Sequence, residues 1–137
     1  YATAEHWMMA GKARLFNDAT TLDRILRDSM MAHPDPDLAK KLGRQVESFN
    51  NEIWLSKAME IVVEGNIAKF SQNREMGLFL EGTGDRVLVE ASPQDVIWGI
   101  GLRRSDPNAA DPRHWKGQNL LGFALMEARA RLRQKAA

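Results

Sequence analysis

The chain has 137 residues, of which 44% are hydrophobic and 27% are charged, and its formal net charge is +1. This length and composition fit one globular domain over residues 1–137, and the near-neutral charge gives no electrostatic argument for a nucleic-acid partner. The sequence has no cysteine, which excludes disulfides, thiol nucleophiles and zinc–thiolate sites, and no apolar run approaches the roughly 20 residues that span a bilayer.

Helical signals dominate the first half of the chain. Thr3 is a predicted N-cap, and apolar residues at three- and four-residue spacing continue from it as far as Leu15. A second helical stripe runs over residues 21–31 and stops at a proline-rich break. A short helix is predicted over residues 35–43, between an aspartate cap and a glycine, and the longest helix over residues 52–70.

The second half combines helical signals with one clear strand. Residues 73–84 predict one or two helical turns, and residues 118–134 predict a long last helix. The alternating valines of residues 86–92 predict a strand, whose partner is expected in residues 98–102 or in a segment before the first residue. Residues 103–117 have the composition of a long, functional loop. The expected class is therefore α+β, a mostly helical single domain with about five or six helices around a small sheet.

Glu5 and Lys12 are the first pair of residues with catalytic potential. They are seven residues apart, so they lie on one face of the predicted helix, two turns from each other. A partly buried lysine can lose its proton and attack a carbonyl carbon, and a nearby carboxylate can transfer protons. The alternative for this pair is an ordinary solvated helix face.

Two carboxylates, Glu90 and Asp95, frame the end of the predicted strand and the turn after it. Catalytic residues concentrate where a rigid element meets a loop, and two carboxylates near a sugar can stabilise an oxocarbenium-like state. The alternative for Asp95 is a residue that caps a turn.

A flat binding surface is predicted after these carboxylates. Trp98 offers a face on which a base can stack, and the bare backbones of Gly99 and Gly101 would let a ribose come close. The alternative is a core tryptophan beside two bend glycines. Asn119 begins the last helix, where it would either bind a hydroxyl or phosphate group or cap the helix.

A metal centre is not predicted. His6, His33 and His114 are far apart in the sequence and have no closely spaced histidine or cysteine partner. His6 is expected on a helix surface. No phosphate-binding glycine motif opens a helix after a strand, and no cofactor is predicted.

Five stretches, in order along the chain, resemble the NADAR family, also called YbiA-like N-glycosidases. They are TAEHWMMAGKARLF, KLGR, IWLSKAMEIVVEGNIAKFSQN, LFLEGTGDRVLVEASPQDVIWGIGL and WKGQNLLGFALMEARARL. The most specific parts are EH with a lysine six residues after the histidine, LVEASPQDVIWGIG and GQNLLGFALMEAR. The resemblance covers nearly the whole chain and implies a mostly helical α+β domain with a cleft for a ribosylated base. Family members usually begin with a strand segment that this sequence lacks, and that segment is expected to line the site.

The resemblance implies hydrolysis of an N-glycosidic bond. The expected substrates are phosphorylated ribosylamino-pyrimidine intermediates of riboflavin biosynthesis. One alternative is ADP-ribosyl-guanine hydrolysis, which reverses ADP-ribosylation of nucleic acid. A second is an ADP-ribose or nucleotide-binding module without turnover, and a third is a helical interaction domain. Imine and oxocarbenium mechanisms both stay open.

The family motifs also imply roles for single residues. The catalytic positions carried over are Lys12, Glu5 and Asp95. The substrate-binding positions are Glu90, Trp98, Gly99, Gly101 and Asn119. The expected partner is a small ribosylated base or an ADP-ribose adduct, with nucleic acid only as a modified substrate and no membrane. No signal peptide is visible, so a cytoplasmic location is expected.

Overall fold

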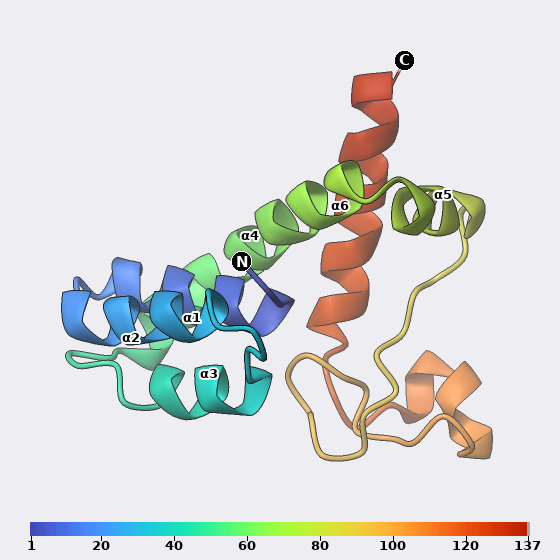
Figure 1. Cartoon of the computed structure of the whole chain (residues 1–137). Coiled ribbons are helices and arrows are strands. Elements are labelled where there is room, and N and C mark those ends of the chain that lie inside the picture. The colour runs from blue at the N-terminus through green and yellow to red at the C-terminus, as the bar shows by residue number, and fades with distance from the viewer. Residues whose placement is uncertain (137) are drawn as a thin grey trace. The chain divides into compact units, whose positions relative to one another are not determined.

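Six α-helices and two short 3-10 helices form the regular structure of the computed structural model, which describes residues 1–136 (Figure 1). The α-helices are α1 (Ala4–Leu15), α2 (Ala19–Ser29), α3 (Pro36–Gly43), α4 (Asn51–Gln72), α5 (Arg74–Gly82) and α6 (Leu120–Ala136). The 3-10 helices η1 (Pro107–Ala110) and η2 (Pro112–His114) lie between α5 and α6 in the sequence. The chain divides into two compact units, Tyr1–Gly65 and Asn66–Ala137.

Side-chain caps explain where the helices of the first unit begin. The predicted caps are confirmed for α1, where the Thr3 hydroxyl accepts from a backbone N–H at 3.3 Å, and for α3, where Asp35 accepts at 2.9 Å. Asp18 caps α2 in the same way at 2.9 Å. For α4 the capping side chain is Asn50, whose Oδ1 accepts from the Ile53 N–H at 2.9 Å. Each cap satisfies a backbone N–H that the helix itself leaves unpaired.

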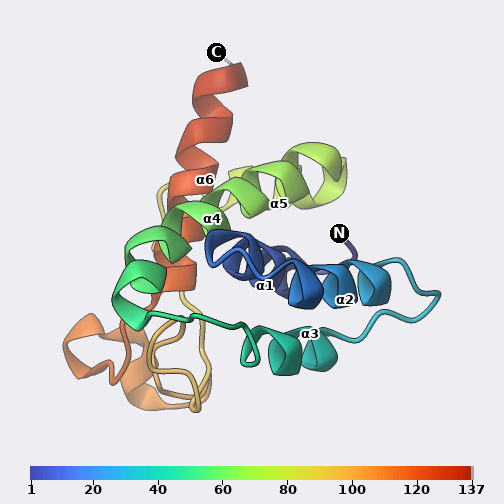
Figure 2. The same cartoon turned by 90° about the vertical axis from the view of Figure 1, so that its left-hand side faces the viewer.

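In the first unit α1, α2 and α3 lie side by side (Figure 2). Small residues on the buried face of α1, Ala10 and Ala13, are fully buried and let the neighbouring helices approach closely, and Ile25 of α2 is also fully buried. The first part of α4 packs on α1 as well, because the Trp7 indole N–H donates to the Ile61 carbonyl at 2.7 Å. These contacts make α1 the central helix of the unit.

In the second unit the expected sheet is wrong. Residues 86–92 have no regular secondary structure, and no strand is formed among residues 1–136, so the structure is helical rather than α+β. The physical reason is that a side chain, rather than a second strand, makes hydrogen bonds with the backbone N–H and carbonyl groups of this segment. The Asn119 amide donates to the Leu88 carbonyl and accepts from the Glu90 N–H, both at 2.9 Å. One amide therefore replaces part of a neighbouring strand.

The predicted long loop has local structure of its own. Asp106 and Asp111 cap the two 3-10 helices, and a proline follows each aspartate at the first helical position. The Trp115 indole N–H donates to the Ala109 carbonyl at 2.9 Å and so closes the loop on itself. Of the helices within residues 1–136, none combines the length and the hydrophobicity needed to cross a membrane.

Candidate active site

Lys12 lies on α1 in a half-buried, largely aromatic environment. Its Nζ donates to the Gly43 carbonyl at 2.7 Å and lies 4.0 Å from the centroid of the Phe49 ring and 5.7 Å from that of Trp54. Burial, and secondarily the positive charge of Arg44, hold the pKa of the Lys12 amine below its ordinary value. These are the surroundings expected of a lysine that can act as a nucleophile.

Glu5 lies two turns before Lys12, about 10 Å along the helix axis. Its side chain is only 19% exposed, and the Nζ of Lys40 is 4.0 Å from its carboxylate. Both Glu5 and Lys12 therefore contact α3, Glu5 through Lys40 and Lys12 through Gly43. Both residues therefore lie between α1 and α3, but at different positions along the two helices.

His6, expected on the surface, is fully buried. Its Nδ1 is 2.7 Å from the Thr3 hydroxyl and its Nε2 is 2.7 Å from the Asp28 carboxylate. The same Asp28 oxygen accepts from the Asp35 N–H at 3.0 Å. The hydrogen bond to His6, followed by that to the Asp35 N–H, lowers the pKa of Asp28. The surface prediction failed because periodicity alone cannot show that α2 supplies a partner for an imidazole on α1.

Asp95 organises the turn that precedes Trp98. Its Oδ1 accepts from the Ile97 N–H at 3.0 Å and from the Trp98 N–H at 2.8 Å. This geometry is that of the turn residue offered as the alternative to catalysis. Its Oδ2 makes no hydrogen bond within residues 1–136, so a second role for the carboxylate stays a prediction.

Gly99 and Gly101 allow close packing of the chain against itself. A Cβ on Gly99 would lie 2.8 Å from the Asp95 carbonyl oxygen and 3.0 Å from that of Glu90. Gly101 has a φ of +69°, which favours glycine, and a Cβ there would lie 2.9 Å from the Lys116 Cβ. The chain's own atoms thus fill the space beside both glycines, and their contact with a ribose stays a prediction.

Asn119 is buried in the turn before α6 and has a φ of +55°. Its side chain binds the extended residues Leu88 and Glu90, and its backbone N–H donates to the Gly99 carbonyl at 3.0 Å. Both polar ends of the amide are therefore engaged inside the protein. The structure gives Asn119 a structural role, and substrate binding by this residue stays a prediction.

Two predicted substrate-binding side chains keep their polar groups available. The Glu90 carboxylate and the Trp98 indole N–H are each half-buried, and neither makes a hydrogen bond within the described part of the chain. The backbone of Glu90 is fixed, because its carbonyl accepts from the Ile100 N–H at 2.9 Å. Glu90 and Trp98 are thus side chains on a rigid backbone with unused hydrogen-bonding capacity.

The candidate residues form two sets. Glu5 and Lys12 belong to the first unit, and the hydrogen bonds described above bring the others together in the second. The members of this second set are Glu90, Asp95, Trp98, Gly99, Gly101 and Asn119. Sequence reasoning missed Gly43, Phe49 and Trp54 around Lys12, since they lie 31 to 42 residues further along the chain. No local spacing identifies them.

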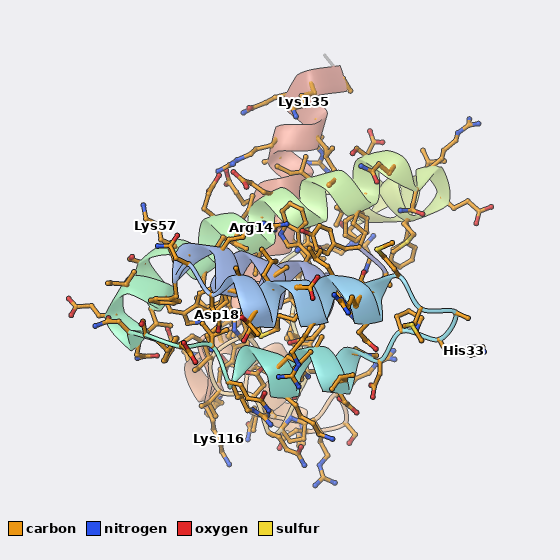
Figure 3. The ribbon with its side chains drawn as sticks, turned by 60° about the vertical axis from the view of Figure 1, so that its left-hand side comes forward. Arg14, Asp18, His33, Lys57, Lys116 and Lys135 are labelled. Atoms are coloured by element: carbon orange, nitrogen blue, oxygen red, sulfur yellow. The ribbon has the colours of Figure 1, made fainter. Side chains whose placement is uncertain are left out.

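The histidines are dispersed. His33 lies in the connection between α2 and α3 (Figure 3), and His114 is bound to Asp111 at 3.1 Å in η2. Within residues 1–136, no three histidine, cysteine, aspartate or glutamate side chains are grouped so that they can hold a metal ion.

Comparisons with known proteins point to one family. The family profile described as NADAR domain matches residues 1–133. N-glycosidase R617 of Acanthamoeba polyphaga mimivirus is 43% identical over 129 residues, which are 94% of this chain and 73% of the relative. N-glycosidase YbiA of Escherichia coli is 30% identical over 96% of this chain and 71% of its own length. Protein irg-1 of Caenorhabditis elegans is 34% identical, and this chain spans 61% of it.

The solved structures include one from this group. The NMR structure of the E. coli protein YbiA matches 98% of this chain and 68% of its own chain, with a TM-score of 0.73 and 29% sequence identity. The resemblance seen in the sequence motifs is therefore confirmed by the profile, by curated relatives and by a solved structure.

Proposed function

This chain belongs to the NADAR family and by that membership is an N-glycosidase, and we propose that its substrate is a ribosylated base. The first candidates are phosphorylated ribosylamino-pyrimidines of the kind made in riboflavin biosynthesis. In this proposal Lys12 is the nucleophile and Glu5 transfers protons. The family relation supports the reaction class, while the substrate and the residue roles are our inference.

The observation that carries the proposal is the environment of Lys12. An ordinary lysine, with a pKa of about 10.4, is neutral in only about one molecule in 2,500 at pH 7, and each decrease of one in the pKa raises that fraction about tenfold. Partial burial and the Arg44 charge lower the Lys12 pKa and so increase the fraction of nucleophilic amine. A lysine on a solvated helix face, the alternative considered from the sequence, would not have this property.

The proposed reaction proceeds through an imine. A proton from Glu5 reaches the ribose ring oxygen, the C1–O bond breaks, and C1 becomes doubly bonded to the nitrogen of the base. The Lys12 amine adds to C1, a proton passes from its nitrogen to the base nitrogen, and the C1–base bond breaks with its electron pair on the departing base. Water then adds to C1, the C1–Nζ bond breaks, and ribose phosphate leaves as the aldehyde.

The second unit offers groups suited to a sugar and a base. We assign to Trp98 the stacking of the base, a contact worth about 1–3 kcal/mol per base in other proteins. We assign to Glu90 or the second oxygen of Asp95 the orientation of a ribose hydroxyl or a water. What supports these roles is that the polar atoms concerned make no hydrogen bond within residues 1–136.

Borohydride trapping tests the proposal. The full chain is incubated with a ribosylamino-pyrimidine phosphate or with ADP-ribosylated guanine, and released base and sugar are measured by mass spectrometry. Borohydride added during turnover is expected to leave a reduced sugar on the peptide that contains Lys12. Lys12→Arg, which keeps the positive charge, is expected to abolish both the adduct and base release.

Each other outcome identifies a different function. Base release without an adduct would contradict the imine and favour an oxocarbenium mechanism that depends on the carboxylates. Binding of ADP-ribose with no release from either substrate, unchanged in Lys12→Ala, would contradict the enzyme assignment and indicate a binding module.

A further inference from the structure

The Lys12 amine lies in a small cage made by the end of α3, the following connection and α4. The Gly43 carbonyl accepts a hydrogen bond from the Lys12 Nζ at 2.7 Å, the Phe49 ring centroid lies 4.0 Å from Nζ and the Trp54 ring centroid 5.7 Å from it. Both aromatic distances are within the range of about 6 Å over which a cation and a ring attract each other. The cage is built from the same kinds of group that proteins use to bind alkylammonium ligands.

The two aromatic walls differ in exposure. Trp54 is 8% exposed and belongs to the core, whereas Phe49 is 43% exposed and precedes α4 in an irregular segment. The Phe49 ring is held by an edge-on contact with Phe16, at 5.4 Å between centroids and 65° between planes. Phe49 therefore has a defined orientation and still borders solvent.

The cage is selective for the charged amine. The Gly43 carbonyl belongs to the last turn of a helix, where carbonyl groups lack helical partners and carry partial negative charge. An aromatic face attracts an ammonium group but gives a neutral amine no comparable stabilisation. Loss of the proton, which the proposed nucleophile must undergo, therefore also weakens its attachment to the cage.

We propose that the Gly43 carbonyl and the Phe49 ring form a resting site for the Lys12 ammonium group, and that Phe49 is a positioning residue which retains the amine until it is deprotonated. This rests on the proposed function of Lys12 as the nucleophile. Phe49 acts through Lys12 and takes no part in the bond changes.

Charged side chains also lie on the elements that surround this resting site. Arg44, at the end of α3, repels the ammonium group, and the Glu5 carboxylate is two turns away on α1 with Lys40 beside it. On the side of α2, the carboxylates of Asp18 and Asp28 are held by hydrogen bonds to other groups. The charged side chains of the first part of α4 are Glu52, Lys57, Glu60 and Glu64. None of these residues is altered in the test below.

The test compares Phe49→Leu with Phe49→Trp. Leucine keeps most of the apolar bulk and removes the π face, whereas tryptophan keeps a π face. The pKa of Lys12 is measured by ¹³C NMR titration of the lysine Cε resonances in the full chain without substrate, and Lys12→Arg assigns the signal. Phe49→Leu is expected to lower the measured pKa by about 0.4 to 0.7, the equivalent of a partly exposed cation–π contact. Phe49→Trp is expected to retain the parent value or exceed it.

A matched control is available on α5, in the second unit. Phe79 is 77% exposed and is no part of the Lys12 cage, so Phe79→Leu makes the same chemical change elsewhere in the chain and is expected to leave the Lys12 titration unchanged. An unchanged or raised Lys12 pKa in Phe49→Leu, or equal decreases in the leucine and tryptophan variants, would overturn the resting site. The NMR titration needs no catalytic turnover, so it tests the resting site even if the chain releases no base.

A kinetic arm tests the positioning role. In Phe49→Leu the pH at which kcat/KM rises is expected to move down by the same amount as the NMR pKa of the chain without substrate. KM at saturating pH is expected to change less than about twofold, because the substrate contacts are untouched. A change confined to KM would show that Phe49 binds substrate instead, and would overturn the positioning role. A parent chain that releases no base contradicts the proposed function and leaves the NMR result to decide on the cage.

Discussion

Asp95 uses only one of its two carboxylate oxygens to hold the turn. Oδ1 accepts from the Ile97 and Trp98 N–H groups and so fixes the turn that presents the Trp98 indole. Oδ2 makes no hydrogen bond within residues 1–136, which leaves it available for a ribose hydroxyl or a water. The turn role therefore does not exclude the chemical role, and a substitution that separates the two oxygens can test both.

Replacing Asp95 with asparagine separates these roles. Asparagine keeps an oxygen for the two backbone N–H groups but loses the charge. The free energy of unfolding of Asp95→Asn is therefore expected to lie within about 0.5–1 kcal/mol of the parent value. Asp95→Ala leaves both N–H groups without their acceptor and is expected to cost about 1–2 kcal/mol in urea denaturation. If the charge acts on the substrate, Asp95→Asn lowers kcat at least about tenfold despite its stability. Full activity in Asp95→Asn would assign the residue to the turn alone.

At the scale of the elements, the sequence predicted the helices better than the extended segment. Helix starts depend on local caps such as Thr3 and Asp35, which can be recognised from a few neighbouring residues. The alternation over residues 86–92 predicted a strand, which the structure does not form. Alternation could not show what would pair with this backbone. Asn119, 31 residues after Leu88, supplies both hydrogen bonds from a side chain. Such a partner has no periodicity, so the sheet was expected and is not found.

The candidate site shows the same division between local and distant information. Glu5 and Lys12 were predicted from their spacing on one helix, and the family motifs pointed to the same positions. The cage around Lys12 was not found, because Gly43, Phe49 and Trp54 come from other elements whose packing on α1 no spacing encodes. His6 was misassigned for the same reason, since Asp28 on α2 makes its burial favourable.

The Asn119 bridge is expected to be the most sensitive link between α6 and the extended segment. Asn119→Gly removes the amide but tolerates the φ of +55°. It leaves the Leu88 carbonyl and the Glu90 N–H unpaired and is expected to cost about 2–4 kcal/mol in the free energy of unfolding. Asn119→Ala adds backbone strain and is expected to be about 1 kcal/mol less stable than the glycine variant. Urea denaturation measures both values, and a glycine variant within about 0.5 kcal/mol of the parent would contradict the bridge.

At the scale of the whole molecule, carboxylates have different tasks in the two units. Asp18, at the start of α2 (Figure 3), accepts from the Thr21 and Glu47 N–H groups, and these hydrogen bonds lower its pKa. Asp28 joins α2 to His6 of α1, and its pKa is lowered too. In the second unit the pKa of Asp111 is lowered to about 2, first of all by Arg113, only two residues away. Asp18 and Asp28 connect segments that are distant in the sequence, whereas Asp111 binds residues of its own short loop.

This difference predicts that acid destabilises the first unit before the second. A carboxyl group whose pKa is lower in the folded chain than its ordinary 3.8 contributes stability above pH 4, and that stability is lost as the pH falls through the folded value. Protonation of Asp18 and Asp28 therefore weakens the first unit as the pH falls below about 4. Asp111 has less effect, because neighbouring residues can interact in the unfolded chain as well.

Fluorine NMR of the chain labelled with 5-fluorotryptophan can follow both units at once, because Trp7 and Trp54 lie in the first unit and Trp98 and Trp115 in the second. The resonances of Trp7 and Trp54 are expected to reach their unfolded positions at the higher pH. Asp28→Asn, which removes one titrating link, is expected to be less stable at pH 7 and to lose less stability in acid, whereas Asp111→Asn is expected to change neither. Simultaneous movement of all four resonances would contradict separate responses and favour the single cooperative domain expected from the sequence.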